Sequence, residues 1–293
     1  MQPDKYSSVW VSHSSMGDFL KCPRAYFLKN IYKDPKSGRK IQVISPALSL
    51  GTVVHEVLEN LKTIPVEERL KRDLLKDYEV AWTKVSRKKR GLQSVEEESE
   101  AKARGRAMIE RVIRKPGPIS RKTLRLKEAH NGMPPNFYLS EDENIILCGL
   151  IDWIEYIEKD DSIVVIDFKT GKHDEGEDSL QLPIYTLLLN TLQKRKVSGA
   201  AYWYLDRSDE PEKVNVPDLI EAKAKVLAVA RRVKAARLTK EFACTRGEEG
   251  CFACGDFEKV LNGEAEYVGV GGYGHDIYII PREDSYEDLA EIV

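Results

Sequence analysis

The segment VVIDFKTGK, residues 164–172, places an acid and an amine inside a run of β-branched residues that ends at a glycine turn. Side chains alternate between the two faces of a β-strand, so Asp167 and Lys169 are expected on one face and Phe168 on the other. A carboxylate beside an ammonium group can belong to an active site, but partly solvated ion pairs of this kind are far commoner. The segment alone does not distinguish the two.

A second acid, Asp152, lies fifteen positions before Asp167 in GLIDWIEY, with the turn sequence EKDDS between them. Two strands joined by this turn would bring the two carboxylates near each other on the same face. Like charges stay together only when a cation lies between them. Hard divalent cations such as Mg²⁺ choose oxygen ligands and keep several waters, as in much phosphate chemistry. With Lys169 placed to position a water or to neutralise a phosphate, these residues can form a metal-assisted phosphodiester hydrolase.

The elements that must hold these residues begin with helices. Of the 293 residues, 42% are hydrophobic, which is enough for a sizeable core. A helix is predicted over 12–32, with a capping box at Ser15 and Asp18 and with Cys22 on the helix. A second amphipathic helix is predicted over 47–62, and helical, highly charged sequence continues to the KPGP turn.

The second half of the chain has the β-branched and aromatic content and the turn punctuation of strands. Three consecutive antiparallel strands are predicted at 136–140, 144–158 and 162–171, then a helix at 179–194, a strand at 199–205 and a long basic helix at 218–240. This order predicts an α/β fold in which a mixed central sheet is flanked by helices. We interpret the chain as one domain, 1–293, made of an N-terminal helical segment (1–50), a helical region (51–120), a region of sheet and helices (121–240) and a cysteine-rich segment with a tail (241–293).

The net charge of −2, from 46 basic and 48 acidic residues, favours no class of partner, but the charges are unevenly distributed. Residues 84–90 carry five lysines and arginines, residues 101–127 carry ten with a single acid, and the helix at 221–240 is also basic. Such segments can attract a phosphate backbone. They can equally form solvated helix faces balanced by the acidic EEESE at 96–100 and by the acidic C-terminal tail, and both interpretations stay open.

The sequence offers no membrane or motor motif. No stretch approaches the ~20 consecutive apolar residues of a membrane span, and the first residues lack the charged and then apolar pattern of a signal peptide. We therefore expect a cytoplasmic protein with no membrane partner. The phosphate-binding motif GxxxxGKS/T of ATP-driven motors is also absent.

Five cysteines in a cytoplasmic chain are not expected to form disulfides. Three of them, Cys244, Cys251 and Cys254, group in CTRGEEGCFAC, which favours ligation of a metal or a cluster. Cys148 lies in the apolar run IILCGLI and is expected to be a buried small hydrophobic residue.

Five motifs, in this order, resemble the RecB-like branch of the PD-(D/E)XK nuclease superfamily from about residue 12 to residue 257. They are SHSSMGDFLKCP, which resembles that branch's SxSxLxxFxxCP motif with Met16 in place of leucine, then GTVVHEVLE, which resembles GxxxH, then GLIDWIEY, VVIDFKTGK and QLPIYTLLL. The resemblance implies the restriction-endonuclease-like core of that superfamily.

Carried onto this chain, the resemblance implies that His55, Asp152 and Asp167 bind a divalent metal, with the main-chain carbonyl of Phe168 as a further ligand. Lys169 would orient or activate the attacking water. Mg²⁺ suits the oxygen ligands, and the mixed set of nitrogen and oxygen ligands suits Mn²⁺ somewhat better.

The resemblance also implies roles for three residues outside this group. Glu128, in LRLKEAH, stands where these nucleases often carry an acid before the strands, which implies binding of a second metal or of its water. Gln181 and Tyr185 match the QxxxY motif, which implies contacts to the substrate backbone near the cut. Pro183 between them places both residues near the start of a helix.

Some members of this branch, such as AddB-type nuclease subunits and CRISPR-associated RecB-like exonucleases, hold an iron–sulfur cluster with one cysteine near the N-terminus and three near the C-terminus. Cys22 with Cys244, Cys251 and Cys254 reproduces this arrangement, which implies a 4Fe–4S cluster that joins the N- and C-terminal segments. The family trio usually runs as CxxC followed by a later cysteine, whereas here Cys244 precedes the CxxC pair and Val260 stands near the later position. A tetrahedral Zn²⁺ would accept the same four thiolates, so both metals stay open.

The leading hypothesis is a metal-dependent deoxyribonuclease, a single-strand-preferring exonuclease acting in DNA recombination, repair or CRISPR adaptation, as many RecB-like relatives do. Because the chain has no motor motif, it would act on single-stranded DNA or open ends, beside a separate helicase or CRISPR adaptation proteins. One alternative is a non-cleaving DNA-end-binding or scaffold subunit of such a complex, and another is an unrelated metallohydrolase of small phosphates. The set of Asp152, Asp167 and Lys169 favours the nuclease, since a pure binder has no need of it.

Overall fold

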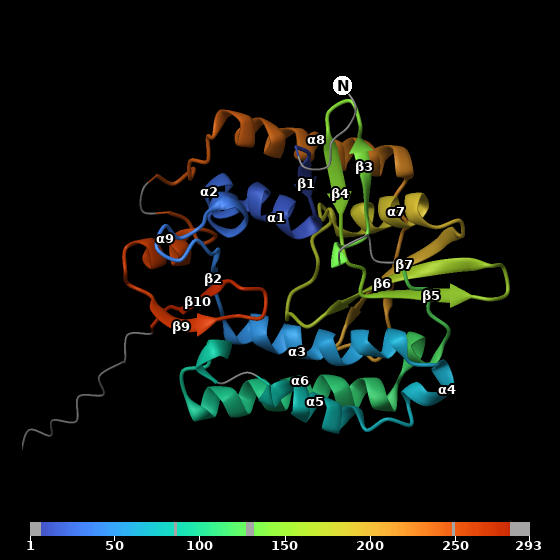
Figure 1. Ribbon diagram of the computed structural model, residues 1–293. Coiled ribbons are helices and arrows are strands. Elements are labelled where there is room, and N and C mark those ends of the chain that lie inside the picture. Colours follow the sequence, from blue (N-terminus) through green and yellow to red (C-terminus); the bar gives the residue numbers. More distant parts are fainter. Residues whose placement is uncertain (1–6, 85–86, 127–131, 248–249, 282–293) are drawn as a thin grey trace, which may run out of the picture.

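A mixed sheet of four strands carries the acids that the sequence singles out (Figure 1). β5 (Trp153–Ile157) pairs antiparallel with β6 (Ser162–Lys169), β6 pairs parallel with β7 (Lys196–Tyr204), and β7 pairs antiparallel with β8 (Glu212–Val214). The predicted α/β fold with a mixed sheet is thereby confirmed. The longer predicted strand at 162–171 ends at Lys169, where the chain turns away from the sheet.

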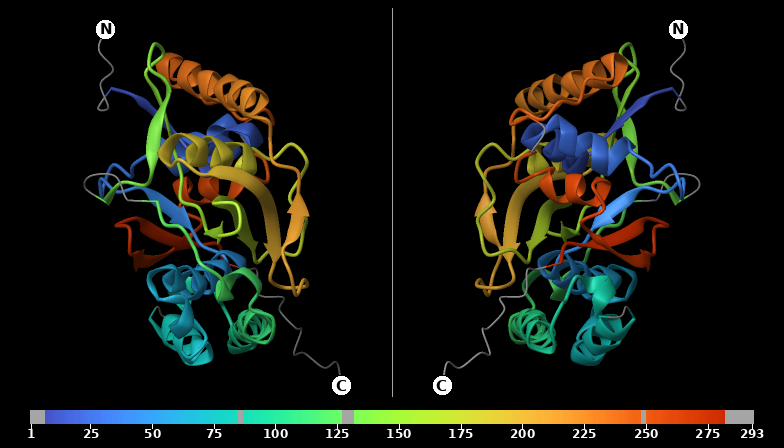
Figure 2. Two further views of the ribbon diagram at one scale, coloured as in Figure 1. Left: turned by 90° about the vertical axis from the view of Figure 1, so that its right-hand side faces the viewer. Right: turned by 90° about the vertical axis from the view of Figure 1, so that its left-hand side faces the viewer.

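Helices cover both faces of this sheet, as the two side views show (Figure 2). One layer contains α7 (Gln181–Leu192) and α8 (Leu219–Thr239), and the other contains α3 (Pro46–Asn60), α5 (Leu74–Thr83) and α6 (Val95–Arg114). Alternate apolar side chains of β6 enter the two hydrophobic cores that these layers form with the sheet. The acid and the amine of β6 therefore share the face that is covered by α7.

The computed structural model describes residues 7–84, 87–126, 132–247 and 250–281. Within this part, no helix is both long and apolar enough to cross a bilayer. The remaining helical elements are short: α1 (His13–Lys21), α2 (Pro23–Tyr26), η1 (Phe27–Ile31), η2 (Leu61–Thr63), α4 (Val66–Arg69), η3 (Lys88–Arg90), η4 (Gly117–Ser120) and α9 (Gly255–Leu261).

Two small sheets bring the ends of the chain against its middle. In one, β4 (Ile145–Cys148) lies between β1 (Val9–Val11) and β3 (Asn136–Ser140). In the other, β10 (Asp276–Ile279) lies between β2 (Ile41–Val43) and β9 (Glu266–Val270). β9 and β10 form a hairpin that extends over the N-terminal part of α3 (Figure 1).

The predicted continuous strand at 144–158 is wrong, and with it the three-stranded meander. The chain breaks between β4 and β5, which belong to different sheets. The break begins at Gly149, where a Cβ atom would lie 3.0 Å from the Leu188 side chain of α7, so glycine suits this close approach of the backbone to the helix. Leu150, which follows it, is 65% exposed. The bend leaves Asp152 just before β5 instead of inside a strand.

The predicted helix at 12–32 is interrupted, and its capping box is made by Ser12 and Ser15 instead of Ser15 and Asp18. Cys22 has extended backbone, with φ −168° and ψ 121°, and stands between α1 and α2. The cause is Pro23, because the residue before a proline is driven out of the helical region while the proline itself suits the first position of the next helix. Cys22 is thus held at a junction.

The basic segment of α6 is paired with acids instead of forming a free positive surface. Such exposed pairs contribute little stability, but they cancel the charge that a phosphate backbone would meet. Ion pairs join Lys102 and Arg106 to Glu79, Arg104 to Asp206, and Arg111 and Arg114 to Asp209. For these residues the structure favours the balanced helix face over a DNA-binding surface.

Candidate active site

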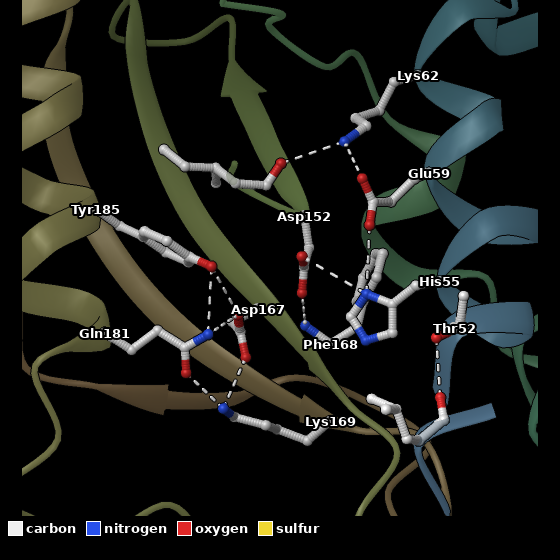
Figure 3. Close-up of polar contacts among 12 residues, drawn as sticks. Thr52, His55, Glu59, Lys62, Asp152, Asp167, Phe168, Lys169, Gln181 and Tyr185 are labelled. Carbon is white, nitrogen blue, oxygen red and sulfur yellow. Dashed lines mark hydrogen bonds and ion pairs between the residues drawn. The ribbon is translucent and has the colours of Figure 1, made fainter. Parts of the chain in front are cut away.

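Asp152 and Asp167 lie opposite each other, as the strand order requires. Trp153 pairs with Ile166 in the antiparallel β5–β6 ladder. The next pair of positions is therefore Asp152, just before Trp153, and Asp167, just after Ile166. Asp152 Oδ2 accepts a hydrogen bond of 2.8 Å from the backbone N–H of Phe168 (Figure 3). Both side chains are nearly inaccessible, since Asp152 is 8% exposed and Asp167 is 2% exposed. Two acids are therefore fixed side by side away from water.

Burial and mutual repulsion make this pair unfavourable when both acids are charged. Burial, together with the charge of Asp152, raises the pKa of Asp167 to about 8, against the opposing effect of Lys169. Burial also acts to raise the pKa of Asp152, but hydrogen bonds from His55 and from the Phe168 N–H, with the charge of His55, outweigh it and hold this pKa below its usual value. One carboxyl of the pair thus carries a proton near neutral pH unless a cation replaces it.

His55 reaches the pair from α3. Its Nδ1 lies 3.6 Å from Asp152 Oδ1 and 3.3 Å from Glu59 Oε1. Burial acts to lower the pKa of His55, but these two carboxylates outweigh it and raise the pKa to about 10. Gly51 permits the approach of α3, because a Cβ atom there would lie only 3.0 Å from Thr170 Oγ1, just beyond the end of β6. This contact gives a physical reason for the glycine one turn before the histidine.

Lys169 is held by three groups on the α7 side of the sheet. Its Nζ lies 3.0 Å from Asp167 Oδ2 and 2.6 Å from Glu175 Oε2, and it donates a hydrogen bond of 2.5 Å to Gln181 Oε1. The acid and the lysine of β6 therefore lie in direct contact in this structure. Glu175 has no counterpart in the sequence motifs, and only the fold of the loop that follows β6 brings it to Lys169.

Gln181 and Tyr185 lie at the start of α7, as Pro183 predicted, and both contact Asp167 (Figure 3). Gln181 Nε2 donates to Asp167 Oδ1 at 2.5 Å, and the Tyr185 hydroxyl donates to the same oxygen at 3.3 Å. In this structure the two residues therefore orient an acid. The contacts to a substrate backbone that the sequence resemblance implies stay a prediction.

The donor set fits a hard divalent cation. Oδ2 of Asp167 is buried and accepts no hydrogen bond from any residue that the structure describes, although Lys169 Nζ lies nearby. Oxygen and nitrogen atoms of His55, Glu59 and Asp152 all lie within 4.8 Å of one another, and this group does not include the predicted ligand Asp167. Carboxylates with one imidazole suit Mg²⁺ or Mn²⁺. The sequence resemblance did not assign Glu59, although its spacing of four from His55 on a helix was a usable signal.

Glu128, which the sequence suggested as a further acidic ligand, lies outside the described residues.

A family model described as the PD-(D/E)XK nuclease superfamily matches residues 10–256. The chain belongs to the PD-(D/E)XK nuclease superfamily. The protein is accordingly a metal-dependent nuclease, a hydrolase that acts on phosphodiester bonds. A search of curated proteins gives no match. The matched region contains β5, β6, α3 and α7, whereas the β9–β10 hairpin lies beyond it.

The nuclease also brings four cysteines together from the two ends of the chain. The sulfur atoms of Cys22, Cys244, Cys251 and Cys254 all lie within 4.8 Å of one another. Cys244 takes part although it departs from the family spacing, and Val260, near the position of the usual later cysteine, packs against the group instead. Burial acts to raise the pKa of Cys251, but hydrogen bonds from the Ala253 and Cys254 backbone lower it to about 7, which favours a thiolate ligand.

Cys148 stands apart from this group, as predicted. Its sulfur contacts the Val11 carbonyl oxygen at 3.5 Å, and burial raises its pKa to about 11. It is the last residue of β4 and is half-buried, so the burial expected from the sequence is only partial.

Replacing Asp167 with asparagine should stabilise the metal-free nuclease increasingly as the pH rises. The pKa of Asp167 is about 8 in the folded protein against 3.8 as reference, so between these values the folded state binds more protons and wild-type stability falls with rising pH. This one group contributes a slope of at most about −1.4 kcal/mol per pH unit. Asp167→Asn removes that slope. Urea unfolding in EDTA across this pH range measures the difference.

The matched control is Asp161→Asn, an exposed acid that pairs with Arg195 and whose pKa is lowered by Tyr156 and Arg195. This control should show no gain with pH. A constant difference between Asp167→Asn and wild type across the range would contradict the mutual repulsion described above.

Proposed function

We propose that this nuclease cleaves DNA at a Mg²⁺ or Mn²⁺ site made by Asp152, Asp167 and His55, with the carbonyl of Phe168 as a further ligand. The observation that carries the proposal is the pair of buried carboxylates on facing chains, with Lys169 on the same face. A pair of this kind is unfavourable without a cation, so its presence in a nuclease fold points to a metal. The bound ion would supply charge stabilisation at the scissile phosphate and an acidified water.

Lys169 acts as a cation in this proposal. Burial acts to lower its pKa, but the charges of Asp167 and Glu175 outweigh it and hold the pKa above its usual value. The ammonium group can therefore orient a water through its protons and neutralise charge on a phosphate oxygen, and it is not suited to accept a proton at neutral pH. Glu175 and Gln181 fix the position of Nζ, because both contact it directly.

Asp167 keeps its orientation through α7. Gln181 and Tyr185 both donate to Oδ1, which leaves Oδ2 directed at Lys169 and available to a ligand. We propose that Gln181 and Tyr185 position the carboxylate of Asp167. We also propose that one or both of them contact the DNA backbone near the cut. Ligands whose own hydrogen bonds are fixed in this way bind a metal in one geometry.

The proposed substrate is single-stranded DNA or an open DNA end, cut as by an exonuclease. The resemblance to RecB-like nucleases supports this choice, and so does the absence of an ATP-motor motif in the printed sequence. We propose that the nuclease acts in DNA recombination, repair or CRISPR adaptation. In these processes it would work beside a helicase or CRISPR adaptation proteins that supply the open strand.

The four cysteines are proposed to hold a 4Fe–4S cluster. Four thiolates suit such a cluster, and the group joins the α1–α2 junction to the residues before α9. Its role in the proposal is to fix the two ends of the nuclease together, with no part in the cleavage.

Asp152→Ala and Lys169→Ala should each lower the cleavage rate about 100-fold or more, since they remove a metal ligand and a cation beside the phosphate. End-labelled single- and double-stranded DNA with Mg²⁺ or Mn²⁺ measures the rate and shows which strand is preferred. Lys172→Ala is the matched control, an exposed lysine three residues further along that should leave the rate unchanged.

Two results would count against this assignment. The first is cleavage by both alanine variants at the wild-type rate. The second is wild-type protein that binds DNA with a steep dependence on salt but does not cut it with either metal, which would support a non-cleaving end-binding subunit.

Cys22→Ser and Cys254→Ser should each lose bound metal and lower the melting temperature, because the group joins the two ends of the chain. Cys148→Ser is the control and should keep both. Iron and zinc analysis and the visible absorption of anaerobically purified protein give the readout. Stoichiometric zinc without iron would show that the four cysteines bind Zn²⁺ instead of a cluster. Metal-free wild-type protein, with an unchanged melting temperature in the serine variants, would contradict both the cluster and the zinc site.

A further inference from the structure

Two large aromatic side chains are left almost fully exposed beside adjoining hollows. Phe252 is 85% exposed and Tyr273 is 91% exposed. Phe252 lines a hollow of about 830 Å³ and Tyr273 lines one of about 560 Å³. The two hollows share Gln42, Ile44 and Leu48, so they adjoin. Tyr273 has a ring neighbour, His275, with the two ring centroids 6.5 Å apart. Aromatic rings exposed beside a hollow offer faces on which unpaired bases can stack.

The hollow at Tyr273 lies along α3 and ends about one turn before His55. Tyr273 lies in the loop of the β9–β10 hairpin, which extends over the N-terminal part of α3 (Figure 1). Leu48 and Thr52 of α3 line this hollow. His55 and Glu59 follow at helical spacing on the same face of α3, and Thr52, His55 and Glu59 point to the same side in the close-up (Figure 3).

Charge distinguishes this side of the active site from the side beyond Lys169. The two adjoining hollows have a nominal net charge of +3 with histidine neutral, from Lys21, Lys29, Lys84, Lys89 and Arg90 against Asp18 and Asp256. Lys29 pairs with Asp18, Lys84 pairs with Glu56 and Arg90 is buried, which leaves Lys21 and Lys89 as the lining cations for which the described residues provide no acid. The hollow beside Lys169 has a net charge of −4, from Glu175, Glu177, Glu212, Asp218 and Glu221 against Lys225. A phosphate backbone is attracted to the first side and repelled from the second.

We propose that a single DNA strand lies along the two positive hollows and stacks its bases on Tyr273 and Phe252 on its way to the active site. The inference rests on the proposed function and names the strand's path. Only unpaired bases offer their faces to a protein ring, so exposed aromatics in a basic groove select single strands over duplex. The hairpin that carries Tyr273 lies beyond the family match at 10–256, so the match does not cover this half of the proposed surface.

The test is binding of a labelled oligothymidylate in EDTA, measured by fluorescence anisotropy, so that no cleavage interferes. An abasic strand of the same length carries the same phosphates without bases and isolates the stacking. Tyr273→Ala and Phe252→Ala should each bind the oligothymidylate about fivefold more weakly or worse. Tyr273→Phe keeps the ring and should keep the affinity. Tyr267→Ala, on β9 of the same hairpin but lining neither hollow, is the matched control.

Wild-type affinity in both Tyr273→Ala and Phe252→Ala, or an abasic strand bound as tightly as the oligothymidylate, overturns the inference while leaving cleavage by the wild type intact. Wild-type protein that neither binds nor cuts single-stranded DNA overturns the proposed function and this path together. Phe252 lies between two of the four cysteines, whereas Tyr273 lies in the β9–β10 hairpin. If Phe252→Ala fails to fold, Tyr273→Ala therefore still tests the inference.

Discussion

Two carboxylates buried opposite each other are the constraint around which the rest of the nuclease is arranged. Asp152 and Asp167 repel each other where water cannot screen them, so positive groups have to come from elsewhere. In this structure His55 supplies one from α3 and Lys169 supplies one from the same strand. A divalent metal would supply more charge at the same place. The instability of the acid pair and its capacity to bind metal are thus one property.

Distant segments serve this pair in different ways. α7 fixes one oxygen of Asp167, and the glycine of α3 lets the helix approach closely enough for His55 to reach Asp152. The four cysteines join the first helices to the residues before α9, while the C-terminal hairpin pairs with β2 and extends over α3. In the proposed strand path, segments from both ends of the chain line the side with net positive charge, whereas the hollow beyond Lys169 is negative.

The sequence predicted β6 and α7 well, because alternation in a strand and spacing in a helix are local properties, and the roles of the site residues stay predictions. It failed where contacts between distant segments decide. The break after Gly149 comes from the approach of α7, and the pairing of the α6 bases with acids about a hundred residues later has no local signature. Glu175 belongs to no motif, and only the folded loop shows that it holds Lys169. The helix break at Cys22 was readable from Pro23, yet it was missed.

Anomalous scattering from crystals soaked in Mn²⁺ shows whether the buried acid pair binds the metal. We expect an ion bound by a carboxylate oxygen of Asp152, by Oδ2 of Asp167 and by the imidazole of His55, and we expect this ion to be lost in Asp167→Asn. An ion bound elsewhere with these three side chains unchanged, or the same ion retained in Asp167→Asn, would contradict the view that the buried acid pair is the metal site.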